Sequence, residues 1–239
     1  VGVNPSFRHM IRSLMRWTGL LGLTVAVAGE PETPAEFDAA YRALEATRGG
    51  TNEPARLKAL FDLTWRYQMI ESPETATSVG YPGLNDRWSD LSAPAIERRR
   101  REVQRPLRVL ATIRPDVLTA EDRLYRDLFE RLLQEQADGD RFPEELLAIN
   151  QMGGPQQEIA QTLSLMPVQS RTDVENLLTR LRGAGPRIAA TQALLQAGLV
   201  RGITPPRITL RDVPQQVLNN MPTDPDQGPL LRPCRTLAA

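Results

Sequence analysis

Apolar residues recur along most of this chain at the three- and four-residue spacing of an amphipathic helix. The clearest stretch is residues 54–71, where one helical face collects Leu57, Leu60, Phe61, Thr64, Trp65 and Gln68. Pro73 follows and marks the end of this helix. The same spacing and the same end signals predict helices over residues 34–47, 94–113, 119–139, 155–165, 172–181 and 186–202, and a short helix that begins at Asp212.

Start and stop signals refine these predicted helices. Thr119 is placed to cap one helix, with Asp122 in the capping-box position, and Gly139 closes it. The apolar stripe of that helix is expected at Leu124, Leu128 and Leu132. We expect a second capping box at Thr172 to Glu175. The helix over 94–113 is expected to bend at Pro106, which has no backbone N–H to donate.

Two stretches do not follow the helical pattern. Residues 72–92 are rich in glycine, proline, asparagine and aspartate, so we interpret them as an ordered loop. Residues 207–211 alternate Ile208 and Leu210 with polar neighbours, as a strand does. The predicted fold class is therefore all-α: a multi-helix array with ordered Pro/Gly-rich loops and at most one short strand.

The chain from Met10 resembles a secretory signal peptide. Arg12 and Arg16 precede the apolar run 17–27, and Ala26-Val27-Ala28 forms a small-residue cleavage signature. The run is short for a membrane span of ~20 residues; a core helix or an anchor is the alternative. We expect a mature chain from Gly29 that is exported, periplasmic or extracellular, with no stable membrane span after cleavage.

Composition narrows the chemistry. The chain has 29 Lys+Arg and 29 Asp+Glu, so no basic excess favours nucleic acid as a partner. It has one histidine, His9, and one cysteine, Cys234. These counts exclude an intrachain disulfide, a cysteine-based zinc cluster and nearly every histidine-dependent mechanism. The prediction is that this chain contains no catalytic residue and no metal ligand set.

The segment 150–157 is the strongest candidate for binding. Two glycines allow a tight turn, Pro155 begins a helix, and the neighbouring amides can donate and accept hydrogen bonds. The segment either forms a structural turn or contacts a carboxylate or carbonyl of a substrate. Farther along the chain, a rigid Thr-Pro-Pro stretch leads to an arginine that could reach a ligand carboxylate. The candidate substrate-binding residues are therefore Asn150, Gln151, Gly153, Gly154, Gln156 and Arg207.

Two other charged motifs have a structural and a functional interpretation. Residues 98–101 are four consecutive arginines, and successive helical residues point in different directions, which favours a solvated face over an anion or partner surface. Asp86 and Asp90 flank Trp88 in a loop. Such carboxylates cap turns or, alternatively, act in acid–base or cation-binding chemistry.

Several separated motifs together resemble one bacterial family. They are residues 61–67, 72–81, 85–92, 150–156, 166–167, 181–187 and 202–207, within a similarity that extends from about Leu57 to Gly228. The chain is identified as a member of the domain of unknown function 885 family. The resemblance implies a helical, often exported protein similar to thermolysin-like zinc metallopeptidases, with a peptide as substrate of the full-length protein.

The resemblance also implies what this chain lacks. The family's zinc motif, H-E-x-x-P-G-H, lies in the C-terminal half of a longer protein, so zinc is expected only there and no catalytic residue carries over. After Gly228–Pro233, which resembles a family segment, residues 234–239 depart from the family pattern. The expected organisation is a leader and signal peptide (1–28), an N-terminal helix and linker (29–52), the family's helical N-terminal region (53–228) and an aberrant tail (229–239).

These expectations lead to one functional hypothesis with two alternatives. The chain is expected to be the N-terminal helical portion of an exported peptidase-like protein, inactive alone. The alternatives are a stand-alone helical binding or interaction module and a non-functional gene fragment. If a missing half normally covers the last helices, they should expose apolar residues that promote self-association. The candidates for such residues are Leu194, Leu195, Leu199 and Val217.

Overall fold

The structure is a computed structural model that describes residues 32–47, 52–224 and 227–235. Within these ranges the regular elements are helices and no strand forms, so the predicted all-α class is confirmed. The predicted signal peptide and the last residues of the chain lie outside the described residues. In the described residues, no helix combines the length and the apolar character that a membrane crossing requires.

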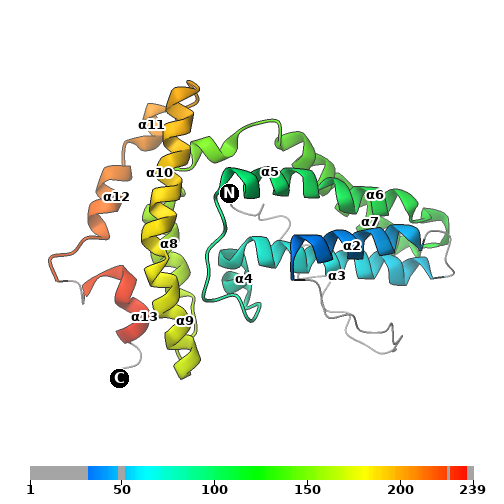
Figure 1. Cartoon of the computed structure of the whole chain (residues 1–239), viewed down its shortest axis with the longest axis horizontal. Coiled ribbons are helices and arrows are strands. Elements are labelled where there is room, and N and C mark those ends of the chain that lie inside the picture. Colours follow the sequence, from blue (N-terminus) through cyan, green and yellow to red (C-terminus); the bar gives the residue numbers. More distant parts are fainter. Residues whose placement is uncertain (1–31, 48–51, 225–226, 236–239) are drawn as a thin grey trace. The chain divides into compact units, whose positions relative to one another are not determined.

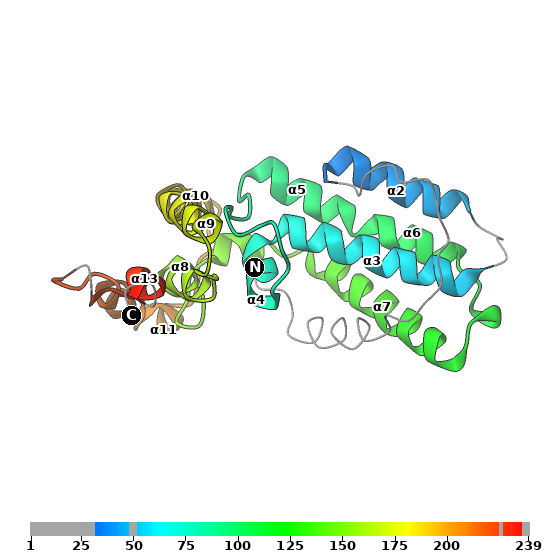
Figure 2. The same cartoon turned by 90° about the horizontal axis from the view of Figure 1, so that it is seen from below.

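The chain divides into two units, which are described separately (Figures 1 and 2). The α3 unit contains the described residues up to Ile70 and the segment Pro94–Phe142. The α8 unit contains Glu71–Ala93 and the described residues from Pro143 onward. Each unit is thus built from two stretches that are separate in the sequence.

The α3 unit is a group of helices placed side by side, with α5 and α6 following one another almost end to end (Figure 2). Its elements are α2 (Pro34–Ala46), α3 (Glu53–Glu71), α5 (Ala93–Glu102), α6 (Gln104–Thr112), the 3₁₀ turn η1 (Pro115–Val117) and α7 (Ala120–Gly139). Aromatic edges hold α3 between its neighbours. Phe37 of α2 meets Tyr67 with ring centroids 5.2 Å apart, and Phe61 meets Phe129 of α7 at 4.9 Å.

The predicted bend at Pro106 takes the form of a break. Helix α5 ends at Glu102, Val103 lies between the helices, and α6 begins at Gln104. Pro106 therefore falls in the first turn of α6. The backbone N–H groups of a first turn have no acceptor within the helix, so the N–H that proline lacks removes no helical hydrogen bond there.

The predicted stripe of α7 is wrong by one position. Phe129 and Leu133 are buried, whereas Leu124 and Leu128 are exposed and Leu132 is half-buried. The contact of Phe129 with the ring of Phe61 fixes which side of the helix faces α3. The larger apolar area of the aromatic side chain favours its burial over that of the leucines. The predicted ends, by contrast, are confirmed, because the Thr119 hydroxyl accepts from the Asp122 N–H and the helix closes at Gly139.

The α8 unit places the short helix α8 at its centre (Figure 1). Its elements are α4 (Pro73–Val79), η2 (Glu144–Leu147), α8 (Pro155–Ser164), α9 (Arg171–Arg182), α10 (Ala184–Val200), α11 (Arg207–Leu210), α12 (Val213–Asn219), η4 (Pro229–Leu231) and α13 (Arg232–Arg235). The core of this unit is Ile159, Leu163, Met166, Leu177 and Ala184, with Trp88, Val168, Leu181 and Leu230 packed against it. Residues from α8, α9 and the start of α10 therefore share one apolar cluster.

Three local predictions in the α8 unit are wrong. The stretch 72–92 is not wholly loop, because Pro73, which follows the end of α3, is also the first residue of α4. The cap of α9 is Ser170, whose hydroxyl accepts from the Asp173 N–H while the Asp173 carboxylate accepts from the Ser170 N–H. The strand-like run begins a turn of helix, α11, because Thr209 donates its N–H to the Pro206 carbonyl.

One close approach fixes α10 against η2. An added Cβ on Gly198 would lie 2.5 Å from the Ile203 carbonyl oxygen and 3.2 Å from that of Leu146. Both atoms belong to the backbone, so no side-chain rotation relieves the contact. Glycine at this position allows the end of α10, its return loop and η2 to meet.

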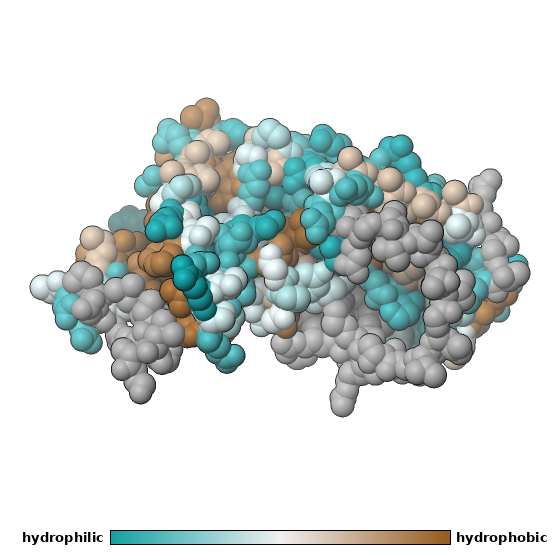
Figure 3. Space-filling view, turned by 60° about the horizontal axis from the view of Figure 1, so that its bottom comes forward, coloured by the Kyte–Doolittle hydropathy of each residue, from teal (hydrophilic) through white to brown (hydrophobic). Residues whose placement is uncertain are grey.

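The surface exposes several large apolar side chains between hydrophilic ones, as the face drawn in Figure 3 illustrates. In the α8 unit, Leu199 and Val217 are exposed as expected for the last helices, whereas Leu194 and Leu195 are half-buried. Val200 and Ile208 in the same unit are also exposed.

Candidate functional site

The segment before α8 is a tight turn closed by its own amide. Asn150 and Gly153 exchange backbone hydrogen bonds, with 2.9 Å from the Asn150 nitrogen to the Gly153 oxygen. The side-chain oxygen of Asn150 accepts from the N–H groups of Met152 at 2.7 Å and Gly153 at 3.0 Å. This acceptor is therefore already used within the turn.

Side chains of α8 and α12 support the turn from within the α8 unit. Gln156 is buried and donates its amide to the carbonyl of Asn150 at 2.9 Å. The carbonyl of Gln151 accepts from Gln157 at 2.7 Å and from Gln216 of α12 at 3.0 Å. The backbone of the turn is thus held at several points.

Gly154 joins the turn to the helix. Its φ of 125° is disfavoured for residues with a side chain, and an added Cβ would lie 2.5 Å from the Gln156 amide oxygen and 3.2 Å from the Ala148 carbonyl oxygen. The predicted need for glycine is confirmed here. Gly153 has a negative φ, and an added Cβ would lie no closer than 3.8 Å to any neighbouring atom, so neither its backbone conformation nor its surroundings require glycine.

A shallow groove of about 350 Å³ lies beside this turn. Its lining is mostly apolar, with three neutral polar residues and no carboxylate: Leu147, Ile149, Asn150, Gln151, Met152, Pro205, Pro206 and Thr209. The groove joins the turn to the Thr-Pro-Pro stretch, because the Gln151 N–H donates to the Thr209 carbonyl at 2.8 Å. Two segments that the sequence analysis considered separately therefore form one site.

The polar residues that line the groove are Asn150, Gln151 and Thr209. The side-chain oxygen of Gln151 is buried and has no hydrogen-bond partner among the described residues. Arg207 follows the lining residue Pro206 and is exposed. No hydrogen bond or ion pair engages its guanidinium in the part of the chain that the structure describes, whereas the next arginine, Arg211, pairs with Asp212 at 2.9 Å. Such a site is equipped to bind polar and apolar groups, and its lining supplies no general acid or base.

The predicted site residues thus have different roles. The structure gathers Asn150, Gln151, Gly153, Gly154 and Gln156 into one turn, where Gln156 and Gly154 are buried supports. Asn150 and Gln151 reach the groove, and Arg207 lies next to the lining residue Pro206.

The carboxylates near Trp88 have structural partners. Asp86 pairs with Arg87 at 3.1 Å, and the Asp90 carboxylate accepts from the Ser92 N–H at 2.8 Å at the start of α5. In the run 98–101, Arg100 pairs with Glu97 at 3.0 Å. The contacts of Asp86 and Asp90 fit the structural interpretation of their loop. In the run 98–101, Arg98, Arg99 and Arg100 are half-buried and Arg101 is exposed, so the run is not a wholly solvated face.

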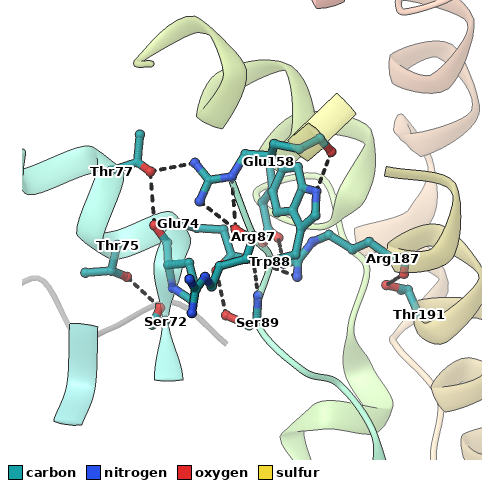
Figure 4. A network of polar contacts seen from close by, with 12 residues as sticks. Ser72, Glu74, Thr75, Thr77, Arg87, Trp88, Ser89, Glu158, Arg187 and Thr191 are labelled. Carbon is teal, nitrogen blue, oxygen red and sulfur yellow. Dashed lines mark hydrogen bonds and ion pairs between the residues drawn. The ribbon is translucent and has the colours of Figure 1, made fainter. Parts of the chain in front are cut away.

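A buried polar network that the sequence analysis missed lies under the Trp88 loop (Figure 4). Arg180 of α9 is 0% exposed. Its guanidinium donates to the carbonyls of Leu84 at 3.0 Å and Arg87 at 2.7 Å, and to the Thr77 hydroxyl at 2.5 Å. In return, the Trp88 indole N–H donates to the Arg180 carbonyl at 2.8 Å. One side chain thereby fastens α4 and the following loop to α9.

A second arginine completes the network. Arg187 of α10 pairs with Glu74 at 2.7 Å and with Glu158 of α8 at 3.1 Å, and its guanidinium lies 5.0 Å from the centre of the Trp88 ring. Glu74 also accepts from the Ser89 hydroxyl at 2.5 Å. Figure 4 shows Glu74, Trp88 and Arg187 around a common centre. The network thus connects α4 and α10 to α8, the helix that follows the turn 150–153.

A sequence signal for Arg180 exists in hindsight. Leu177 and Arg180 are three residues apart on α9, so the arginine lies on the buried side of its helix. A charged residue at such a position requires several hydrogen-bond acceptors. The acceptors themselves are 93 to 103 residues away in sequence, so no local pattern indicates them.

The described residues do not suit a zinc ion. They contain no group of three or more His, Cys, Asp or Glu side chains arranged to hold a metal. The chain's single histidine, His9, lies outside the described ranges. No chemical step is therefore assigned to zinc here.

Comparisons with known proteins place most of the chain in one family. The family model described as "Bacterial protein of unknown function (DUF885)" matches residues 73–239. No curated protein and no solved structure matches the chain.

Proposed function

Because this chain belongs to the bacterial DUF885 family, we propose that it is the peptide-binding helical region of an exported, peptidase-like protein. In this proposal the groove beside the turn 150–153 forms part of a substrate-binding wall. Groups outside the described residues supply the chemistry, as the resemblance to zinc metallopeptidases implies. The chain alone would bind peptide without cleaving it.

The observation that carries the proposal is the composition of the groove. Leu147, Ile149 and the two prolines offer an apolar surface for one side chain, while Asn150 lines the same groove with a side-chain nitrogen that donates no hydrogen bond to the described residues. The turn is fastened by α8 and α12, so its backbone is organised before a ligand arrives. Preorganisation lowers the entropic cost of binding.

The proposal predicts that a charge at the groove weakens peptide binding. Met152 lines the groove and is 82% exposed, so Met152→Asp should leave the fold intact. Burying an apolar peptide side chain next to the new carboxylate costs desolvation, and we expect affinity for apolar peptides to fall at least fivefold. Fluorescence anisotropy with a panel of labelled peptides measures this change.

Met221 offers a matched control. It is 70% exposed, follows α12 and does not line the groove, so Met221→Asp should leave affinity unchanged. Equal losses in both variants, or no peptide bound by the unmodified chain, would refute the proposal.

A further inference from the structure

Deepening the proposed function, on which this inference rests, we propose that Met152 is an oxidation site that regulates the groove. A hydroperoxide converts its thioether to a sulfoxide, and the oxidised groove binds an apolar peptide side chain more weakly. The proposed function concerns what the groove binds, whereas this inference concerns a chemical modification that stops the binding.

The exposure of the side chain is the first argument. Met152 is 82% exposed and Met221 is 70% exposed, whereas Met166 is 5% exposed and Met69 is 0% exposed. These are the four methionines of the described residues. An oxidant must reach the sulfur of a methionine to modify it, so susceptibility follows exposure. A dilute hydroperoxide is therefore expected to modify the two exposed methionines before the two in the core.

The position of Met152 is the second argument. It belongs to the apolar part of the groove lining, together with Leu147, Ile149 and two prolines, whereas Met221 does not line the groove. Oxidation converts this flexible apolar side chain into a polar one. An apolar peptide side chain that packs against the new oxygen would strip it of water, which costs free energy. Of the two exposed methionines, Met152 is therefore the one whose oxidation affects the groove.

The support of the turn is the third argument. The Met152 N–H donates to the Asn150 side-chain oxygen at 2.7 Å. The neighbouring Gln151 carbonyl accepts from Gln157 at 2.7 Å and from Gln216 at 3.0 Å. These hydrogen bonds do not use the thioether, so oxidation should change the groove lining and leave the turn in place. The loss of binding is thus a local effect that can be separated from unfolding.

The reaction is a two-electron oxygen transfer. The methionine sulfur attacks one oxygen of the hydroperoxide, and the S–O bond forms while the O–O bond breaks. The second oxygen takes the proton of the first and leaves as water when the oxidant is hydrogen peroxide. The sulfur is oxidised and the peroxide is reduced, so no other reactant is required. Methionine sulfoxide reductases reverse the change, which makes the modification a switch.

The test treats the full chain with hydrogen peroxide and follows two quantities in the same samples. Peptide mapping by mass spectrometry gives the oxidised fraction of each methionine, and fluorescence anisotropy gives the affinity for a labelled apolar peptide. We expect Met152 and Met221 to react about tenfold faster than Met69 and Met166. The affinity should fall about fivefold as Met152 is oxidised, with an unchanged circular dichroism spectrum, and methionine sulfoxide reductases A and B should together restore it.

Met152→Leu and Met221→Leu are the matched variants, and each is compared with itself before and after peroxide. The loss of affinity should vanish in Met152→Leu and persist in Met221→Leu. A loss that persists in Met152→Leu would refute the inference and assign the effect to another group, such as the thiol of Cys234. Complete oxidation of Met152 at unchanged affinity would also refute it and leave the proposed function standing. Absence of peptide binding before oxidation would refute both proposals.

Discussion

At the scale of single residues, Arg180 is a cation in the interior of the α8 unit, and no carboxylate of the described residues pairs with it directly. Burial lowers the pKa of Arg180 to about 10, against the opposing influence of the Glu74 and Asp86 carboxylates. The side chain therefore remains charged at neutral pH. Its charge is balanced by the dipoles of the Leu84 and Arg87 carbonyls and the Thr77 hydroxyl.

We predict that Arg180→Met destabilises the protein although it preserves much of the side-chain volume. The variant leaves buried carbonyls without donors, and the expected loss is about 2–4 kcal/mol in the free energy of unfolding. Arg182→Met on the same helix changes an exposed residue and should stay within about 0.5 kcal/mol. Urea denaturation followed by circular dichroism measures both, and similar values for the two variants would contradict the role of Arg180.

At the scale of elements, the features that depend on residues within one turn of helix could be predicted from the sequence. The features that depend on contacts with other helices could not. The hydroxyl cap at Thr119 and the stop at Gly139 are local, and both were predictable. Which side of α7 is buried depends on the contact of Phe129 with Phe61 of α3. The apolar periodicity of α7 alone therefore predicted the wrong side. The run at 207–211 has no neighbouring strand among the described residues, and the Pro206 carbonyl closes a helical turn instead.

The candidate site divides in the same way. Its tight turn could be predicted from the Asn150, Gly153 and Gly154 positions alone. Its supports could not, because Gln216 contacts the turn from 65 residues away and Asn220 contacts the Gln156 carbonyl from 64 residues away. The groove itself needed tertiary structure, since it joins the turn to Pro205 and Pro206.

Helix α10 provides a test with two glycines and opposite expected signs. Gly198→Ala should destabilise the protein by about 1–3 kcal/mol, because the new methyl group would overlap the backbone oxygens of Ile203 and Leu146. Gly185→Ala meets nothing within 4 Å, so the better helix propensity of alanine should stabilise by up to about 1 kcal/mol. Thermal and urea unfolding give both values, and a shared sign would be evidence against the close approach of α10 and η2.

At the scale of the whole molecule, we predict that the purified chain binds no stoichiometric zinc and cleaves no peptide. One histidine and one cysteine leave carboxylates as nearly the whole supply of ligands, which suits zinc poorly. Elemental analysis after dialysis and a fluorogenic peptide assay test this. One tightly held zinc per chain would overturn the prediction, and loss of that zinc in His9→Ala or Cys234→Ser would identify the ligand.

The split of the α8 unit into two stretches has a consequence for synthesis of the protein. Thr77 leaves the ribosome 103 residues before Arg180, the side chain that binds it. At about 5–20 residues per second, α4 and its loop wait roughly 5–20 s for their anchor. Throughout this interval Trp88 of the nascent chain is not yet covered and is accessible to chaperones and proteases. The length of this exposed period is set by the number of residues between the loop and α9, which includes the insertion 94–142.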